Sequence, residues 1–80
     1  MKNINLYRKS SGRIDSLERG SAQRLDFPNG LIFLKDVPHA EGFYSYTVVN
    51  GRGDIVETGS ANNLKELRQA AKEVKNTKRC

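Results

Sequence analysis

The stretch NNLKELRQAAKEVKN, residues 62–76, carries the strongest structural signal in the chain. Its apolar residues recur at intervals of three and four, which is the spacing of an amphipathic helix. They are Leu64, Leu67, Ala71 and Val74. Asn63 can cap the start of the helix, and Glu66 stands where it completes a capping box. We therefore predict a helix over 62–76 whose apolar stripe must be buried.

Four segments rich in β-branched and aromatic residues precede this helix, and turn residues separate them. The segments cover residues 22–27, 31–37, 43–49 and 55–58. Pro28-Asn29-Gly30 punctuates the first gap, Pro38 to Gly42 the second and Asn50-Gly51 the third. Three consecutive hairpin connections therefore predict a meander of about four strands.

The third turn contains Arg52-Gly53-Asp54, a tripeptide known from adhesion proteins. Asn50-Gly51 favours a two-residue hairpin turn, and Gly53 equally permits a looser loop that runs through Asp54. Both alternatives place the tripeptide at a hydrophilic hairpin tip. We interpret it as a turn rather than as an adhesion signal.

Taken together, these elements predict the α+β class: an antiparallel β-meander with one C-terminal amphipathic helix packed on the sheet. The helix is expected to cover the face that carries Tyr44, Tyr46 and Val48. The length of 80 residues predicts one small domain over 1–80, and a domain of this size buries only about 60–65% of its unfolded surface.

The ends of the chain are less regular. Residues 1–21 are expected to hold a strand at 4–9 and a flexible basic segment, and residues 77–80 a frayed tail. Residues 13–21 are compatible with a helical turn, a strand edge or a mobile arm. A strand at 4–9 would form an exposed sheet edge suited to pairing, so the oligomeric state stays open.

Compartment is indicated by cysteine usage and by hydropathy. Cys80 is the single cysteine, so no internal disulfide can form, whereas small secreted domains usually have several. No apolar run follows the first charged residues, and the longest apolar run, 31–34, is too short to span a bilayer. A cytoplasmic protein without a membrane partner is predicted.

The sequence shows no catalytic or metal-binding constellation. A zinc site needs four ligands, drawn mainly from Cys and His, and the chain offers His39 and Cys80 alone. His39 lies near Asp36 and Glu41, but no motif places a nucleophile beside it. We predict a protein that is not an enzyme and has no cofactor and no metal.

Charge is the strongest indication of function. The net charge is +5, and both ends of the chain are basic: residues 1–26 hold six Lys or Arg against three acids, and residues 62–80 six against two. The predicted helix carries a row of cations that could follow a phosphate backbone or an acidic protein surface. The candidate binding residues are Lys65, Arg68, Lys72, Lys75, Arg8, Lys9, Arg13 and Arg52.

The stretch from Leu31 to Val74 resembles the later part of a double-stranded-RNA-binding domain, in which three antiparallel strands lead into a helix with lysines at its start. LKELRQAAKEV occupies the place of that helix. The resemblance implies phosphate contacts for Lys65 and Arg68, and it places Pro38-His39 in the loop between the first two strands. Leu64 stands where the family has a lysine, and no clear N-terminal helix precedes the sheet.

Two functions are compatible with these observations. In the first, a small non-catalytic protein binds DNA, RNA or a nucleic-acid-handling complex through a basic helix face and a basic N-terminal segment. In the alternative, a phage-type inhibitor or adaptor binds a host defence or replication assembly by protein–protein contacts. The sequence does not choose between a nucleic acid and an acidic protein surface as partner.

Overall fold

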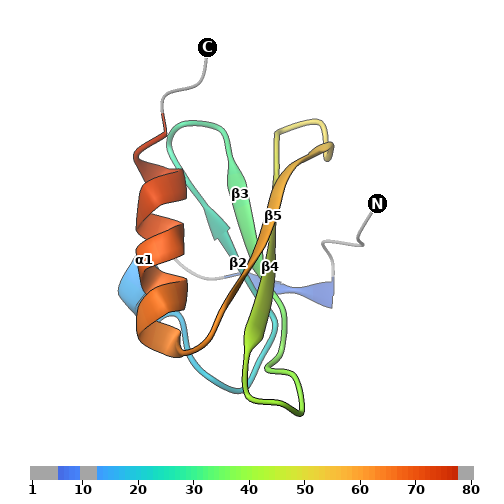
Figure 1. Ribbon diagram of the computed structural model, residues 1–80. Coiled ribbons are helices and arrows are strands. Elements are labelled where there is room, and N and C mark those ends of the chain that lie inside the picture. Colours follow the sequence, from blue (N-terminus) through green and yellow to red (C-terminus); the bar gives the residue numbers. More distant parts are fainter. Residues whose placement is uncertain (1–5, 10–12, 78–80) are drawn as a thin grey trace.

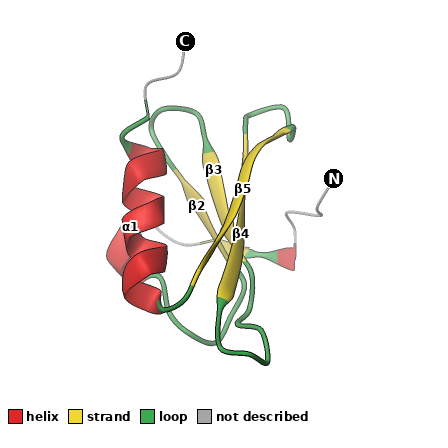
Figure 2. Ribbon diagram, viewed as in Figure 1, coloured by secondary structure: helices red, strands yellow, loops and turns green. Residues whose placement is uncertain are grey.

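The computed structural model describes residues 6–9 and 13–77, and it shows a sheet covered on one face by a helix (Figures 1 and 2). The elements are β1 (Arg8–Lys9), the 3-10 helix η2 (Ile14–Ser16), β2 (Gln23–Asp26), β3 (Ile32–Lys35), β4 (Tyr44–Val49), β5 (Ile55–Ala61) and α1 (Leu64–Lys75). The α+β class is therefore confirmed.

The sheet has five strands in the order β1-β2-β3-β4-β5. Strands β2 to β5 form the predicted antiparallel meander, and β1 adds a strand parallel to β2 at the edge. The strand expected at residues 4–9 is short, because only Arg8–Lys9 pair with β2. Residues 4 and 5 of that prediction lie outside the described residues.

The three hairpins of the meander share one loop geometry. In each, a three-residue loop ends in a glycine with positive φ, and two backbone hydrogen bonds close the turn. The loops run from Phe27 to Leu31, His39 to Phe43 and Asn50 to Asp54, with Gly30, Gly42 and Gly53 at φ of 90°, 95° and 88°. The looser loop through Asp54, not the two-residue turn at Asn50-Gly51, is thus the one that forms.

The core lies between α1 and the face of the sheet that it covers. Leu67, Ala71 and Val74 are buried there, as the apolar spacing predicted. The strands contribute the rings and aliphatic side chains that meet them, among them Leu25, Phe33, Tyr44, Tyr46 and Val48. The predicted contact of the helix with Tyr44, Tyr46 and Val48 is confirmed.

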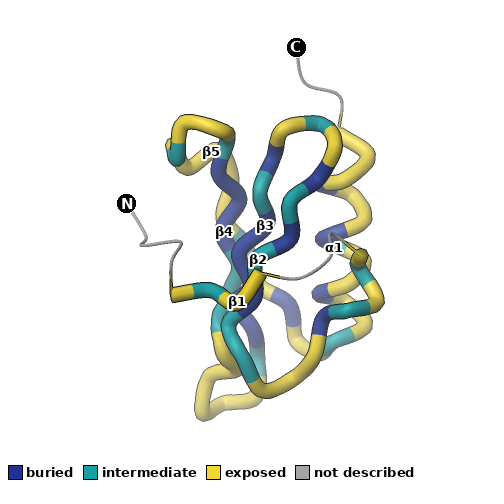
Figure 3. Tube along the Cα trace, turned by 180° about the vertical axis from the view of Figure 1, so that it is seen from behind, coloured by how far each residue is buried: buried dark blue, intermediate teal, exposed yellow. Residues whose placement is uncertain are grey.

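The opposite face of the sheet is also partly buried. Side chains alternate along a strand, so Leu34 and Val49 point away from the helix, yet only 0% and 1% of their surface is exposed. Residues 6–9 lie on this side of the sheet (Figure 3). There the hydroxyl of Tyr7 donates a 2.6 Å hydrogen bond to the carboxylate of Asp36.

Candidate nucleic-acid interface

Helix α1 is held at both ends by side chains. At its N-terminus the Asn63 side chain accepts a 2.9 Å hydrogen bond from the backbone N–H of Glu66. The Glu66 carboxylate accepts from the N–H of Asn62, the residue before the cap, and not from the N–H of Asn63, so the predicted cap forms but the reciprocal bond of a capping box does not. At its C-terminus the Asn29 amide donates to the carbonyls of Val74, Lys75 and Thr77. The helix is therefore fixed relative to the β2–β3 hairpin.

The charged residues of α1 lie on two different flanks. One turn contains 3.6 residues, so successive residues are about 100° apart around the axis. On that geometry the four cations share one side of the buried stripe, and Glu66 and Glu73 lie on the other. The cations are Lys65, Arg68, Lys72 and Lys75, all exposed, and we call them the basic flank.

The basic flank adjoins η2. The Arg68 guanidinium donates a 3.1 Å hydrogen bond to the backbone carbonyl of Leu17, whose side chain is buried in the core. Residues 13–21 therefore include a helical turn packed beside α1, one of the three alternatives that the sequence allowed. Segment η2 lies beside α1 (Figure 1), and Arg13 directly precedes it in the chain.

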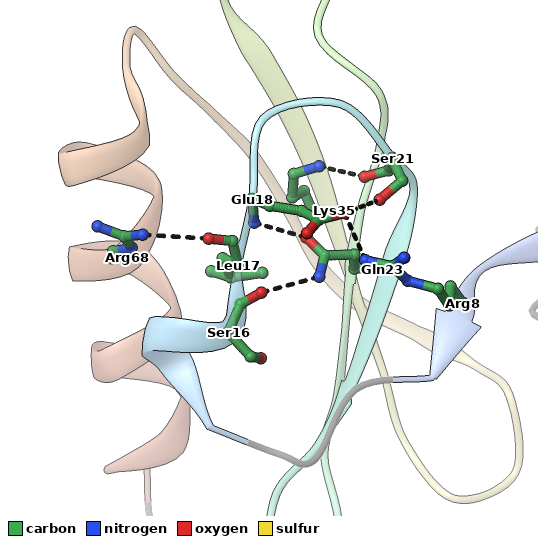
Figure 4. Close-up of polar contacts among 8 residues, drawn as sticks. All are labelled: Arg8, Ser16, Leu17, Glu18, Ser21, Gln23, Lys35 and Arg68. Carbon is green, nitrogen blue, oxygen red and sulfur yellow. Dashed lines mark hydrogen bonds and ion pairs between the residues drawn. The ribbon is translucent and has the colours of Figure 1, made fainter.

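A polar network ties this segment to the sheet (Figure 4). The buried amide of Gln23 accepts from the N–H of Glu18 at 2.8 Å and donates to the carbonyl of Ser16 at 3.0 Å. The fully buried Lys35 ammonium donates to the carbonyl of Ser21, and burial lowers the pKa of this group. Residues 16–21 are thus positioned by side chains of β2 and β3.

Arg8 belongs to the same network rather than to the basic flank. Its guanidinium forms an ion pair with the Glu18 carboxylate. Hydrogen bonds from Ser21 and Arg8 lower the pKa of Glu18, which keeps the pair charged. The structure therefore gives Arg8 a structural partner at the sheet edge.

The other predicted residues are dispersed. Lys9 lies at the sheet edge with its ammonium 3.9 Å from the Asp26 carboxylate, and Arg13 lies 3.5 Å from Asp15. Arg52 stands at the β4–β5 hairpin tip, away from α1 (Figure 1). The structure thus places Arg13 at the start of η2, which packs beside α1, and it leaves Arg8, Lys9 and Arg52 elsewhere.

Several cations have no partner within residues 6–9 and 13–77. Lys65, Lys72 and Lys75 make no ion pair or side-chain hydrogen bond there, and neither does Arg19. Arg19 was not among the predicted site residues, because residues 13–21 had no definite structure from sequence alone. It is exposed and follows Leu17, whose carbonyl Arg68 contacts, by two residues.

The opposite flank of α1 faces β4 and β5. The Tyr46 ring stacks on Phe33 with centroids 5.0 Å apart and passes over Gly59 of β5. Burial, together with the carboxylates of Glu57 and Glu73, raises the pKa of the Tyr46 hydroxyl. The two sides of the helix therefore differ in sign of charge as well as in neighbours.

The remaining chemistry is limited. In the part of the chain that the structure describes, no three His, Cys, Asp or Glu side chains are grouped to hold a metal ion. His39 is exposed, stacks on Phe43 at 4.2 Å and hydrogen-bonds the Ser45 hydroxyl at 2.8 Å. Cys80 lies outside the described residues. These observations leave the charged surfaces as the candidate sites.

Comparison with known proteins adds no relative. No family model, curated protein or solved structure matches the chain. Over residues 6–9 and 13–77, no helix has the length and apolar character needed to cross a membrane. The proposals below therefore rest on the geometry of this chain.

Proposed function

We propose that the protein is a non-catalytic nucleic-acid-binding protein of the cytoplasm that contacts backbone phosphates through the basic flank of α1. One observation carries this proposal: four cations line one side of a rigidly held helix, and the helix acids lie on the other. A helix whose charges served only solubility would gain from mixing the two signs along each face, where Glu–Lys pairs stabilise it.

The dimensions of the basic flank support the proposal. Lys65 and Lys75 are ten residues apart, which corresponds to about 15 Å along the helix axis. One strand of a duplex presents a phosphate about every 3.4 Å of rise, so about four phosphates lie within this length. Arg13 and Arg19 stand before and after η2 in the chain, and Arg68 contacts the carbonyl of Leu17 between them.

The partner-free lysines make this surface available. Lys65 and Lys72 need not break an ion pair within residues 6–9 and 13–77 before they contact phosphate. Each phosphate that is neutralised releases condensed counterions, so affinity falls as salt rises. On a duplex, the logarithm of the binding constant is expected to fall with the logarithm of the salt concentration with a slope of about −0.9 per contact. Four contacts predict a slope of about −3.6, and about −2.8 on a single strand.

The test is fluorescence anisotropy with labelled single- and double-stranded DNA and RNA over a salt series. The double variant Lys65→Gln/Lys72→Gln removes two charges from the basic flank. The matched control Lys9→Gln/Arg52→Gln removes two charges from elsewhere. On a duplex, we expect the variant Lys65→Gln/Lys72→Gln to make the salt slope shallower by about 1.8. The control Lys9→Gln/Arg52→Gln should change the slope by less than about half of that amount.

Two outcomes would overturn the proposal. One is the absence of binding by the wild-type protein to all four nucleic acids in about 50 mM salt, where phosphate contacts are strongest. The other is an equal loss of affinity in the flank variant and in its control, since that would show attraction by net charge alone.

A further inference from the structure

The two edges of the sheet differ in how well they are protected from a further strand. Natural edge strands are commonly shielded by shortness, by cations or by proline. At one edge, β1 has two residues, Arg8 and Lys9, both charged. At the other edge, β5 has seven residues with no cation and no proline, and Ile55 and Val56 are 49% and 38% exposed.

Among residues 6–9 and 13–77, strand β5 has one neighbour in the sheet, β4, so no described strand pairs with the other side of its backbone. The N–H of Asp36 bonds the carbonyl of Ser45, which shows that Ser45 turns its backbone groups toward β3. Groups alternate along a strand, so Tyr44, Tyr46 and Val48 turn theirs toward β5. Opposite Ser45 and Thr47, residues Ser60 and Thr58 therefore point their N–H and C=O groups outward.

A register shift at Val48/Val49 interrupts the start of the strand. It lies beside Ile55 and Val56, whereas the pairing from Glu57 to Ala61 is regular. A bulge twists an edge and discourages pairing at that point. The regular part, Glu57–Ala61, is thus the segment with the geometry to accept another strand.

The charge beside this edge is negative. Glu57 is exposed and lies on the same face of the sheet as Tyr46, because it pairs with Val48, two residues from Tyr46. Glu73 of α1, like Glu57, lies near the hydroxyl of Tyr46. These two carboxylates have no ion-pair partner among residues 6–9 and 13–77.

From these observations we infer that the outer edge of β5 binds an extended basic segment of another protein, which adds a sixth strand to the sheet. Backbone hydrogen bonds to Thr58 and Ser60 supply the pairing, as in other cases of strand addition. Lysine or arginine at alternate positions of the segment lies on the helix-covered face, beside Glu57 and Glu73. A second copy of this chain fits less well, because pairing through β5 would bring two such acidic flanks together.

This inference is independent of nucleic-acid binding, which uses the other flank of α1. It can be tested with an acetylated heptapeptide that alternates lysine and valine, titrated into ¹⁵N-labelled protein. We expect amide shifts concentrated in β5. The same peptide with alternate backbone nitrogens methylated keeps its charge but loses half of its N–H donors. It should not bind when the methylated nitrogens are those that face β5.

Two protein variants separate pairing from charge. Thr58→Pro removes an outward N–H, a substitution that edge strands tolerate, and should abolish peptide binding while the remaining spectrum stays dispersed. Glu57→Lys should weaken binding about five- to tenfold, since it replaces attraction by repulsion. The matched control Glu41→Lys makes the same change at the β3–β4 loop and should leave binding unaltered.

Three results would overturn the inference. In the first, an acidic peptide that alternates glutamate and valine binds equally well. In the second, the lysine peptide leaves the β5 resonances unshifted. In the third, the protein sediments as a dimer that Thr58→Pro dissociates, so that the edge already holds a second copy.

Discussion

The guanidinium of Arg68 lies 3.1 Å from the backbone carbonyl of Leu17, a residue 51 positions earlier in the chain. This contact joins the basic flank of α1 to the segment that carries Arg13 and Arg19. It gives Arg68 two separable properties: a positive charge at the surface and a hydrogen bond that positions its neighbours.

Arg68→Lys should separate these two properties. Lysine keeps the charge but lacks the planar fork that reaches the Leu17 carbonyl, so the free energy of unfolding should fall by about 1 kcal/mol. The salt slope for nucleic-acid binding should remain unchanged, whereas Arg68→Ala should reduce it by about 0.9 on a duplex. Urea unfolding and anisotropy measure the two effects. Equal slopes for the alanine and wild-type proteins would remove Arg68 from the proposed interface.

Asn29 is expected to stabilise the fold by donating hydrogen bonds to backbone carbonyls at the C-terminal end of α1. Its amide donates to carbonyls of Val74, Lys75 and Thr77, and its side-chain oxygen accepts from the N–H of Leu31. Asn29→Ala should therefore lower the free energy of unfolding by about 1–2 kcal/mol. Asn76→Ala, at the C-cap itself, is the control and should cost less than about 0.5 kcal/mol. Equal losses in urea titrations would contradict this role.

Gly59 is required by the close approach of Tyr46. A Cβ at this position would lie 2.4 Å from the Tyr46 hydroxyl oxygen and 2.5 Å from Cζ, so the ring would have to leave its place on Phe33. Gly59→Ala should destabilise the protein by about 1–3 kcal/mol. Gly20→Ala has no atom within 4 Å of the new Cβ, and it should change stability by less than about 0.5 kcal/mol. Thermal unfolding of both variants decides the matter, and a neutral Gly59→Ala would refute the argument.

Asp26 should make stability depend on acid pH. Two hydrogen bonds from Arg24, at 2.7 and 2.8 Å, lower the pKa of this carboxyl below its ordinary value of 3.8, and Lys9 adds to the effect. The unfolded chain therefore takes up the proton first as pH falls. The stabilisation is fully present above about pH 5 and is lost as pH falls through the unfolded pKa and then the folded pKa.

The measurement for Asp26 is the free energy of unfolding between pH 6 and pH 2, in the wild-type protein and in Asp26→Asn. We expect the variant to be less stable at pH 6 and the difference to shrink toward pH 2. Asp15→Asn is the control, because Asp15 makes only an exposed contact with Arg13. A difference that does not change with pH would show that the Arg24 contact favours neither protonation state.

Local pattern predicted much of this fold. The spacing of Leu67, Ala71 and Val74 and the N-cap at Asn63 are properties of residues close together in the sequence, and α1 forms as they require. The hairpins follow from glycines that accept positive φ, and for that reason the meander was predictable. The basic flank was also predictable, since it depends on helical spacing alone.

Other features depend on residues that meet only after folding. The loop at Asn50 is a local exception: the Asn50 side chain accepts from the N–H groups of Arg52 and Asp54, two and four residues further on. No periodicity encodes the contacts of Gln23 and Glu18. Gln23 pairs with Arg8 of β1 and holds the segment before β2, and Glu18 is the ion-pair partner of Arg8. The sequence also does not give the distances in space between the predicted cations. For that reason Arg52 was predicted to share a binding surface with the cations of α1, from which it lies far away.

The sequence by itself therefore determined α1 and the strands β2 to β5, because helix and turn formation depend on residues a few positions apart. Tertiary structure decided where those elements meet: Asn29 at the end of α1, Leu17 beside Arg68, and Tyr46 over Gly59. Each of these contacts joins residues at least 13 positions apart. Their geometry depends on how the hydrophobic surfaces pack, and packing is a property of the whole chain.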